Sequence, residues 1–274
     1  MFRLKCLWGV FAVLIFSCES MATPNNLSPT VVDIDAPSKV LFIGNSYSYY
    51  NNGIATLYSN LVRSSGLWNN SEFSTRQKTI SGGRLAEHLA GFSELLTRPN
   101  SQSWDVVVMQ EYSNGPIKNN SSATEFQQAS GQLAKLIRAY HGTPVFFMTW
   151  AYKGNKAMVQ QLRDAYVAQA NKLNMLVVPV GLAFAASQEK FPTIELYSKD
   201  VQGIDEHGQV VYQTLEKHPS LAGSYLAACV FYATLQGKSP AGLSYTAGLP
   251  LEQAKQLQNL GWQTSQQFLK MNSH

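Results

Sequence analysis

The chain has 274 residues, of which 45% are hydrophobic and only 14% are charged. Globular domains usually carry about 25% charged residues, and this apolar composition excludes a disordered chain and a coiled coil. The 21 Lys and Arg residues and 17 Asp and Glu residues give a net charge of +4, and no four basic residues are consecutive. We therefore expect no nucleic-acid partner, and the length suits one domain with a well-buried core.

Residues 1–22 are predicted to form an export signal. Arg3 and Lys5 precede an apolar stretch of ten residues, Leu7 to Phe16. A mature helix that spans a bilayer needs about 20 apolar residues, so the stretch is typical of a signal and not of a membrane anchor.

Two processing routes are compatible with this signal. The tripeptide Ser20-Met21-Ala22 suits ordinary cleavage, whereas the sequence that ends in Cys18 resembles a bacterial lipobox. In the second route a lipid on Cys18 would attach the chain to a membrane, and we expect no other membrane contact. Both routes predict a bacterial protein that is periplasmic, secreted or an outer-membrane lipoprotein.

The cysteine and histidine residues give no sign of a metal site or a cofactor. Only Cys229 lies outside the signal region, within an apolar segment typical of a buried core. The five histidines are scattered and show no zinc-type spacing with cysteine.

After a polar lead, residues 23–38, the pattern predicts one domain over residues 39–274. Short runs bounded by turn residues are typical of buried strands. The predicted strands are 39–43, 73–80, 104–109, 144–149 and 175–180. The predicted helices are 54–64, 85–96, 124–140, 157–173, 220–236 and 251–270.

This alternation predicts an α/β fold, a three-layer α/β/α sandwich with a central parallel sheet of about five strands. Residues 186–217 break the pattern, because they are polar and show no clear period. Ligands of such sheets collect at the carboxyl ends of the strands.

Three of the predicted strand ends carry residues suited to hydroxyl-based catalysis. Ser46 follows the first strand, Gly82 the second and Asn114 the third. His218 precedes a helix near the end of the chain. A hydroxyl nucleophile needs a neutral imidazole to accept its proton, and backbone N–H groups or an Asn side chain can hold an oxyanion.

This constellation resembles the SGNH (GDSL-like) hydrolase superfamily, and in particular a poorly characterised bacterial branch of it. The segment His218-Pro-Ser-Leu-Ala-Gly-Ser-Tyr-Leu-Ala-Ala228 is its most specific element. The resemblance covers about residues 39–236 and implies a flavodoxin-like fold. It also implies that Ser46 is the nucleophile, that His218 is the base and that Gly82 and Asn114 donate to the oxyanion.

The acid that orients His218 is not fixed by this pattern, because the position three residues before it is Leu215. We favour Glu216. Asp200 is an alternative if residues 201–215 form an excursion whose ends meet, and a catalytic dyad is another. Gln110 is a rival to Asn114 as an oxyanion or substrate donor.

The sequence thus predicts an exported serine esterase that hydrolyses a carboxylic ester, either an acetyl ester of a glycan or a small acyl ester. Tyr47, beside the nucleophile, and Gln110 are expected to contact this small-molecule or glycan substrate. The alternative is a non-catalytic glycan- or envelope-binding protein on the same scaffold. A nucleotide-binding protein is disfavoured, because the chain lacks G-x-G-x-x-G and a P-loop.

Overall fold

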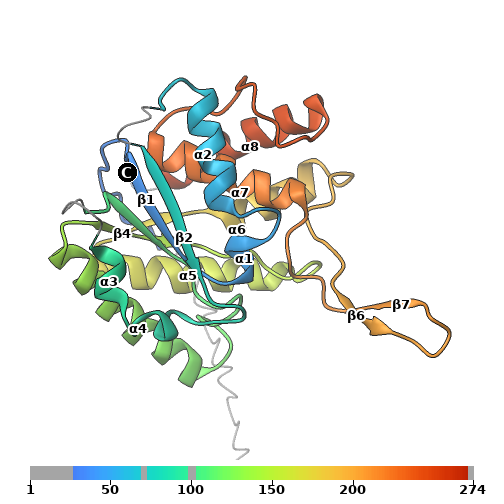
Figure 1. Cartoon of the computed structure of the whole chain (residues 1–274), viewed down its shortest axis with the longest axis horizontal. Helices are drawn as coiled ribbons and strands as arrows, with labels where there is room; N and C mark the ends of the chain where they lie inside the picture. Colours follow the sequence, from blue (N-terminus) through green and yellow to red (C-terminus); the bar gives the residue numbers. More distant parts are fainter. Residues whose placement is uncertain (1–26, 69–72, 98–102, 271–274) are drawn as a thin grey trace, which may run out of the picture.

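The computed structural model describes residues 27–68, 73–97 and 103–270 (Figure 1). Its centre is a single sheet of five strands in the order β2-β1-β3-β4-β5, and every neighbouring pair is parallel. The strands are β1 Lys39–Gly44, β2 Ser74–Thr79, β3 Val106–Met109, β4 Thr143–Phe147 and β5 Leu176–Val178. The predicted parallel sheet is confirmed.

Helices cover both faces of this sheet, as Figure 1 shows. One layer contains α2 Ile54–Ser64, α6 Val180–Lys190, α7 Leu221–Gln236 and α8 Leu251–Lys270. The opposite layer contains α3 Phe92–Leu96, α4 Asn120–Ala139 and α5 Lys156–Leu173. The three-layer sandwich is therefore confirmed.

The alternation of side chains along each strand builds two separate cores. In β1, Val40 and Phe42 face the layer of α2 and α7, whereas Leu41 and Ile43 face the layer of α4 and α5. A strand with apolar side chains on both faces must be covered on both faces, which explains the apolar run. Helix α7 is likewise buried from Ala222 to Gln236, and its residues are mostly apolar on all sides.

The predicted helix over residues 85–96 is divided in the structure. A 3₁₀ turn, η1 Leu85–His88, and helix α3 are separated at Gly91, which has a φ of 67°. Glycine adopts this left-handed backbone conformation readily, and Gly91 is the N-cap residue from which α3 starts. The helix over 124–140 in turn begins earlier than predicted, because Asn119 caps it by accepting from Ser122 N.

The segment without a predicted pattern contains regular structure that sequence reasoning missed. The last residues of helix α6 form the start of this segment. An antiparallel hairpin of β6 Val201–Ile204 and β7 Val210–Tyr212 follows. The hairpin projects from the body of the molecule (Figure 1) and leaves apolar side chains in solvent, with Ile204 71% exposed. Since no face of it is buried, it lacks the polar–apolar alternation from which strands are predicted.

The export signal predicted for residues 1–22 lies outside the described residues, as does the start of the polar lead. The described part of the lead runs along α5, where Thr30 donates to Asn171 and Arg163 donates to the carbonyl of Leu27. Within the described ranges, no helix combines the length and apolar character needed to cross a membrane.

Candidate active site

Ser46 lies where β1 ends and the short helix α1 Ser46–Tyr49 begins. Asn45 holds this turn: its side chain accepts from Tyr47 N and donates to the carbonyl of Gly83 at 2.9 Å. Gln110 at the end of β3 accepts from Asn45 N at 2.9 Å. The ends of three neighbouring loops are thus tied together, and the Ser46 hydroxyl is presented at the carboxyl edge of the sheet.

His218 lies between a hydroxyl and a carboxylate. Its Nε2 is 2.8 Å from Ser46 Oγ, and its Nδ1 is 2.5 Å from Asp200 Oδ2. A carboxylate accepts a hydrogen bond only from a nitrogen that carries a hydrogen, so Nδ1 carries the hydrogen of the neutral ring and Nε2 is free to accept from Ser46. This is the geometry of a Ser-His-Asp triad.

Glu216 was predicted to be the acid that orients His218. In the structure Asp200 holds this position, so that prediction is corrected. Glu216 accepts instead from Lys153 Nζ at 2.7 Å, and Lys153 also binds Glu195. Asp200 reaches the imidazole because the chain leaves and returns at the stem of the hairpin, where Gln213 N donates to Asp200 O at 2.8 Å. Residues 201–212 therefore leave the domain and return to it beside Asp200, as the Asp200 alternative required.

Tyr50 supports both members of the His218–Asp200 pair, and the sequence analysis did not assign it this place. Its ring stacks on the imidazole with 4.2 Å between centroids and 11° between planes. Its hydroxyl donates to the second Asp200 oxygen, Oδ1, at 3.0 Å. Burial and this hydrogen bond raise the pKa of Tyr50 to about 12, so the hydroxyl remains a donor at neutral pH.

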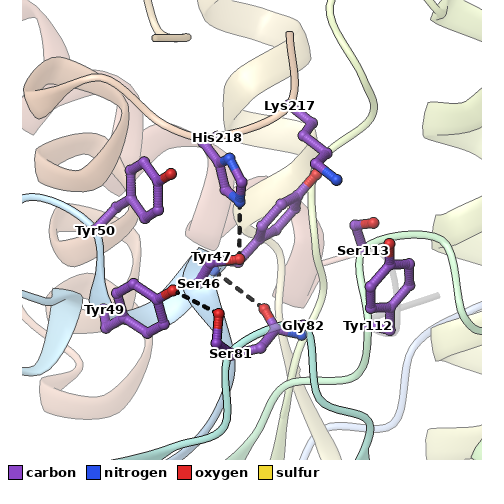
Figure 2. Close-up of a pocket in the computed structure, with 11 residues that line it drawn as sticks. Ser46, Tyr47, Tyr49, Tyr50, Ser81, Gly82, Tyr112, Ser113, Lys217 and His218 are labelled. Atoms are coloured by element: carbon purple, nitrogen blue, oxygen red, sulfur yellow. Dashed lines mark hydrogen bonds between the residues drawn. The ribbon is translucent and has the colours of Figure 1, made fainter. Parts of the chain in front are cut away.

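A pocket of about 230 Å³ opens beside Ser46. Figure 2 shows Tyr49 and Tyr50 on one side of the serine, with Tyr112 and Ser113 on the other. The remaining lining residues are Asn45, Tyr47, Ser81, Gly82, Lys217 and His218. The pocket is small and dominated by hydroxyl groups, so it suits a short acyl group and polar neighbours.

Two backbone N–H groups at this pocket are available to a ligand. Ser46 is the first residue of α1, so its N–H has no acceptor inside that helix. Gly82 lines the pocket with a φ of 65°, and neither N–H donates to any other described residue. The Ser81 hydroxyl, 3.1 Å from the Tyr49 hydroxyl, holds the Gly82 loop against α1.

Asn114 and Gln110 do not occupy the places predicted for them. Asn114 is not among the lining residues, and its Oδ1 is buried without a hydrogen-bond partner in the described chain. Gln110 is fully buried and uses its amide on Asn45, Ser48 and the carbonyl of Glu111. Tyr112 and Ser113 are the residues of this loop that line the pocket, and Gln110 supports the nucleophile turn through its bonds to Asn45 and Ser48.

Tyr47 lines the pocket, as predicted, and is held rigidly from behind. Its ring stacks on Trp150 at 4.3 Å and 3°, and Trp150 stacks on Phe184 at 4.3 Å and 5°. Trp150 Nε1 also donates to the carbonyl of Lys217 at 2.9 Å. The apolar sequence around Trp150 indicates a strand end, and only the fold shows that it joins the nucleophile turn to the segment before His218.

No cluster of His, Cys, Asp or Glu side chains with metal-binding geometry occurs in the described ranges. Cys229 is buried in α7, and burial raises the pKa of its thiol far above the ordinary value. A reactive cysteine has a lowered pKa, so this thiol is a core residue.

Comparisons with known proteins give similarities at the level of structure. No protein-family model matches the sequence, and neither does any curated protein. Among solved structures, a provisionally assigned SGNH hydrolase from Slackia heliotrinireducens is 27% identical, with a TM-score of 0.51. The alignment covers 72% of this chain and 96% of that one.

Two further structures share the fold at lower identity. Axe2, an acetylxylan esterase from Geobacillus stearothermophilus, is 17% identical with a TM-score of 0.50, over 73% of this chain and 95% of that one. TesA is 19% identical with a TM-score of 0.50, and the alignment covers 72% of this chain and 98% of TesA. The chain has the SGNH-hydrolase fold, so the predicted resemblance is confirmed, and these similarities support the prediction of an ester-hydrolysing serine hydrolase.

Proposed function

We propose that this chain, which has the fold of SGNH hydrolases, is a serine esterase that uses Ser46, His218 and Asp200. The observation that carries the proposal is the continuous set of contacts from Ser46 Oγ to His218 Nε2 at 2.8 Å and from His218 Nδ1 to Asp200 at 2.5 Å. Ser46 lies in a pocket with two backbone donors, Ser46 N and Gly82 N, that donate to no other described residue.

In the first half of the reaction Ser46 Oγ attacks the ester carbonyl while His218 Nε2 takes the serine proton. The carbonyl oxygen becomes an oxyanion that accepts from the N–H groups of Ser46 and Gly82. Asp200 accepts from Nδ1–H and stabilises the imidazolium. The C–O bond to the alcohol then breaks, and His218 returns its proton to the departing oxygen.

In the second half water attacks the acyl-enzyme, and His218 Nε2 takes a proton from that water. The tetrahedral intermediate uses the same two backbone donors. Collapse breaks the bond to Ser46 Oγ, which recovers the proton from His218, and the carboxylic acid leaves.

The proposed substrates are short acyl esters, with an acetyl ester of a glycan as the preferred class. The small volume of the pocket limits the acyl chain, and its tyrosine rings and hydroxyl groups suit a sugar alcohol. The acetylxylan esterase with the same fold fits this choice, although it is only 17% identical. Acetylated sugars, compared with long-chain p-nitrophenyl esters, would test it by their kcat/KM values.

A serine-directed fluorophosphonate probe tests the nucleophile directly. We expect the wild type to be labelled and to hydrolyse p-nitrophenyl acetate, and Ser46→Ala to do neither. Ser93→Ala, which changes an exposed serine of α3, is the matched control and should behave as the wild type. An unlabelled, inactive wild type would reject the esterase and favour the non-catalytic glycan-binding alternative.

We also propose that the esterase acts outside the cytoplasm. The support is the sequence of residues 1–22, with its basic start and ten-residue apolar stretch. Fractionation of bacteria that produce a C-terminally tagged chain should place it outside the inner membrane. A Cys18→Ser variant that leaves the membrane fraction would indicate the lipoprotein route, whereas an unchanged distribution would indicate ordinary cleavage.

A further inference from the structure

One side of the proposed active-site pocket carries a positive charge that no carboxylate of the described residues balances. Lys217 is the only lysine or arginine in the described lining, and no Asp or Glu side chain belongs to it. The nearby Asp200 carboxylate is already used by His218 and Tyr50. The pocket therefore offers a cation without a counter-ion.

The other cations around the pocket loops are paired. Lys153 lies 2.7 Å from each of Glu195 and Glu216. Arg84, next to the Gly82 loop, pairs with Glu125 at 3.1 Å and approaches the buried Glu111 at 3.8 Å. Lys217 is a half-buried residue, and its ammonium forms no ion pair or hydrogen bond with any described residue.

The Lys217 backbone is nevertheless fixed. Its carbonyl accepts from Trp150 Nε1, and the side chain extends along the pocket toward the side of Ser113 (Figure 2). A charge that is partly removed from water is costly unless a partner compensates it. A bound anion would provide that partner.

A second, independent observation lies on the same side of the pocket. The Tyr47 hydroxyl is buried, with 2% of the residue exposed, and the nearby Ser113 hydroxyl does not complete a hydrogen bond of good geometry with it, nor does any other described residue. Burial raises the pKa of Tyr47 well above its ordinary value, so this hydroxyl keeps its proton. Leaving a buried hydroxyl unpaired costs free energy, which a ligand acceptor atom would recover.

The stack behind Tyr47 keeps this hydroxyl in place, because the ring rests on Trp150 and Trp150 rests on Phe184. Ser113 adds another hydroxyl, oriented by Tyr152 at 3.0 Å. Three donors thus border the same space: an ammonium and two hydroxyls. A carboxylate has only acceptor sites, and it can satisfy all three at once.

We propose that Lys217, Tyr47 and Ser113 form an anion subsite, and that the natural substrate is an ester that carries a carboxylate near the scissile bond. This inference rests on the proposed esterase function. The carboxylate can belong to the acid part, as in a hemiester of a dicarboxylic acid, or to the alcohol part, as in an acylated acidic sugar. Two pairs of test esters distinguish these sources.

The first pair places the charge on the acid: p-nitrophenyl hemisuccinate against p-nitrophenyl butyrate. The second places it on the alcohol: 4-acetoxybenzoate against 4-acetoxybenzamide. After subtraction of the uncatalysed rate, kcat/KM should favour the anionic member of at least one pair by about tenfold or more, the size of one charge-assisted contact. The pair that shows the preference identifies the source of the charge.

Substitutions connect that preference to the subsite. Lys217→Met should reduce the anionic-to-neutral ratio about tenfold, Lys217→Arg should retain most of it, and Tyr47→Phe should reduce it several-fold while keeping the aromatic stack. Lys238→Met, an exposed lysine after α7, changes the net charge equally and should leave the ratio unchanged. Added salt should weaken the preference of the wild type and not that of Lys217→Met.

A measurement that needs no turnover completes the test. Succinate, and not succinamide, should slow the labelling of Ser46 by the fluorophosphonate in the wild type and not in Lys217→Met. If the wild type is labelled but shows neither protection nor anionic preference, or if the preference survives in Lys217→Met, the anion subsite is wrong and the esterase stands. An unlabelled and inactive wild type would instead overturn the esterase itself.

Discussion

At the scale of single residues, the environment of His218 decides between two acidic residues, Glu216, which the sequence analysis favoured, and Asp200, its alternative. Asp200 is 18 residues away and binds Nδ1, whereas Glu216 is two residues away and binds Lys153. The Asp200 side chain is 10% exposed, and its second oxygen is occupied by Tyr50. A carboxylate fixed on both oxygens orients the imidazole better than a partly solvated one that is paired with Lys153.

Two substitutions test this assignment. We expect Asp200→Asn to lower kcat/KM for p-nitrophenyl acetate by about 10³ to 10⁴, because an amide can hold the imidazole in the wrong tautomer. Glu216→Gln should change it by less than about threefold, since a pair at the surface contributes little. The opposite order of effects would return the acid role to Glu216.

At the scale of elements, the β6–β7 hairpin lies between two residues of the proposed triad without packing on the domain. Its two strands pair with each other, and the side chains of Val201, Ile204 and Tyr212 remain exposed. Asp200 is positioned below the hairpin, where Asp200 O accepts from Gln213 N and Ser198 N donates to His218 O. The stem, and not the hairpin itself, determines the geometry of the acid.

We therefore expect the hairpin to be removable. Replacing residues 201–212 by Asn-Gly keeps the Asp200–Gln213 bond as the closing pair of a two-residue turn. The shortened chain should retain kcat/KM for p-nitrophenyl acetate within about threefold, because the hairpin does not line the described pocket. A loss of activity with an unchanged melting temperature would show that the hairpin contributes directly to the site.

At the scale of the whole molecule, the parallel sheet fixes the site and also buries a titratable group behind it. His88 is 1% exposed, its Nε2 lies 3.1 Å from the carbonyl of Gly44, and its Nδ1 has no partner in the described chain. Burial lowers its pKa, so the folded protein resists protonation of this ring while the unfolded chain does not. No sequence pattern indicated that a histidine lies behind the nucleophile turn.

This difference makes stability depend on pH. Because the unfolded chain binds the proton more readily, the free energy of unfolding should fall as pH decreases below the unfolded value of about 6.5, by up to about 1.4 kcal/mol per pH unit. Urea denaturation at several pH values between 7.5 and 5 would give the unfolding free energy as a function of pH. This free energy should fall less steeply with decreasing pH for His88→Gln, which keeps a donor for the carbonyl of Gly44. Equal slopes in the two proteins would show that His88 does not cause the acid sensitivity.

Most of the fold could be predicted from the sequence because the central strands are buried on both faces and read as apolar runs between turns. The runs that become β1, β3, β4 and β5 are of this kind, and α4 and α5 show the helical period. Helix α6 and the hairpin were missed for opposite reasons. Helix α6 lacks a one-sided apolar stripe, and the hairpin has no buried face.

The sequence by itself determined the class of fold and placed Ser46, Gly82 and Tyr47 at one edge, because residues that follow parallel strands must meet there. It could not determine which acid meets His218, which side chains of the Gln110–Asn114 loop line the pocket, or that Lys217 has no counter-ion among the described residues. Those outcomes depend on how distant loops close against one another. Contacts between Asp200 and His218, or between Trp150 and Lys217, have no local pattern and exist only once the sheet has assembled.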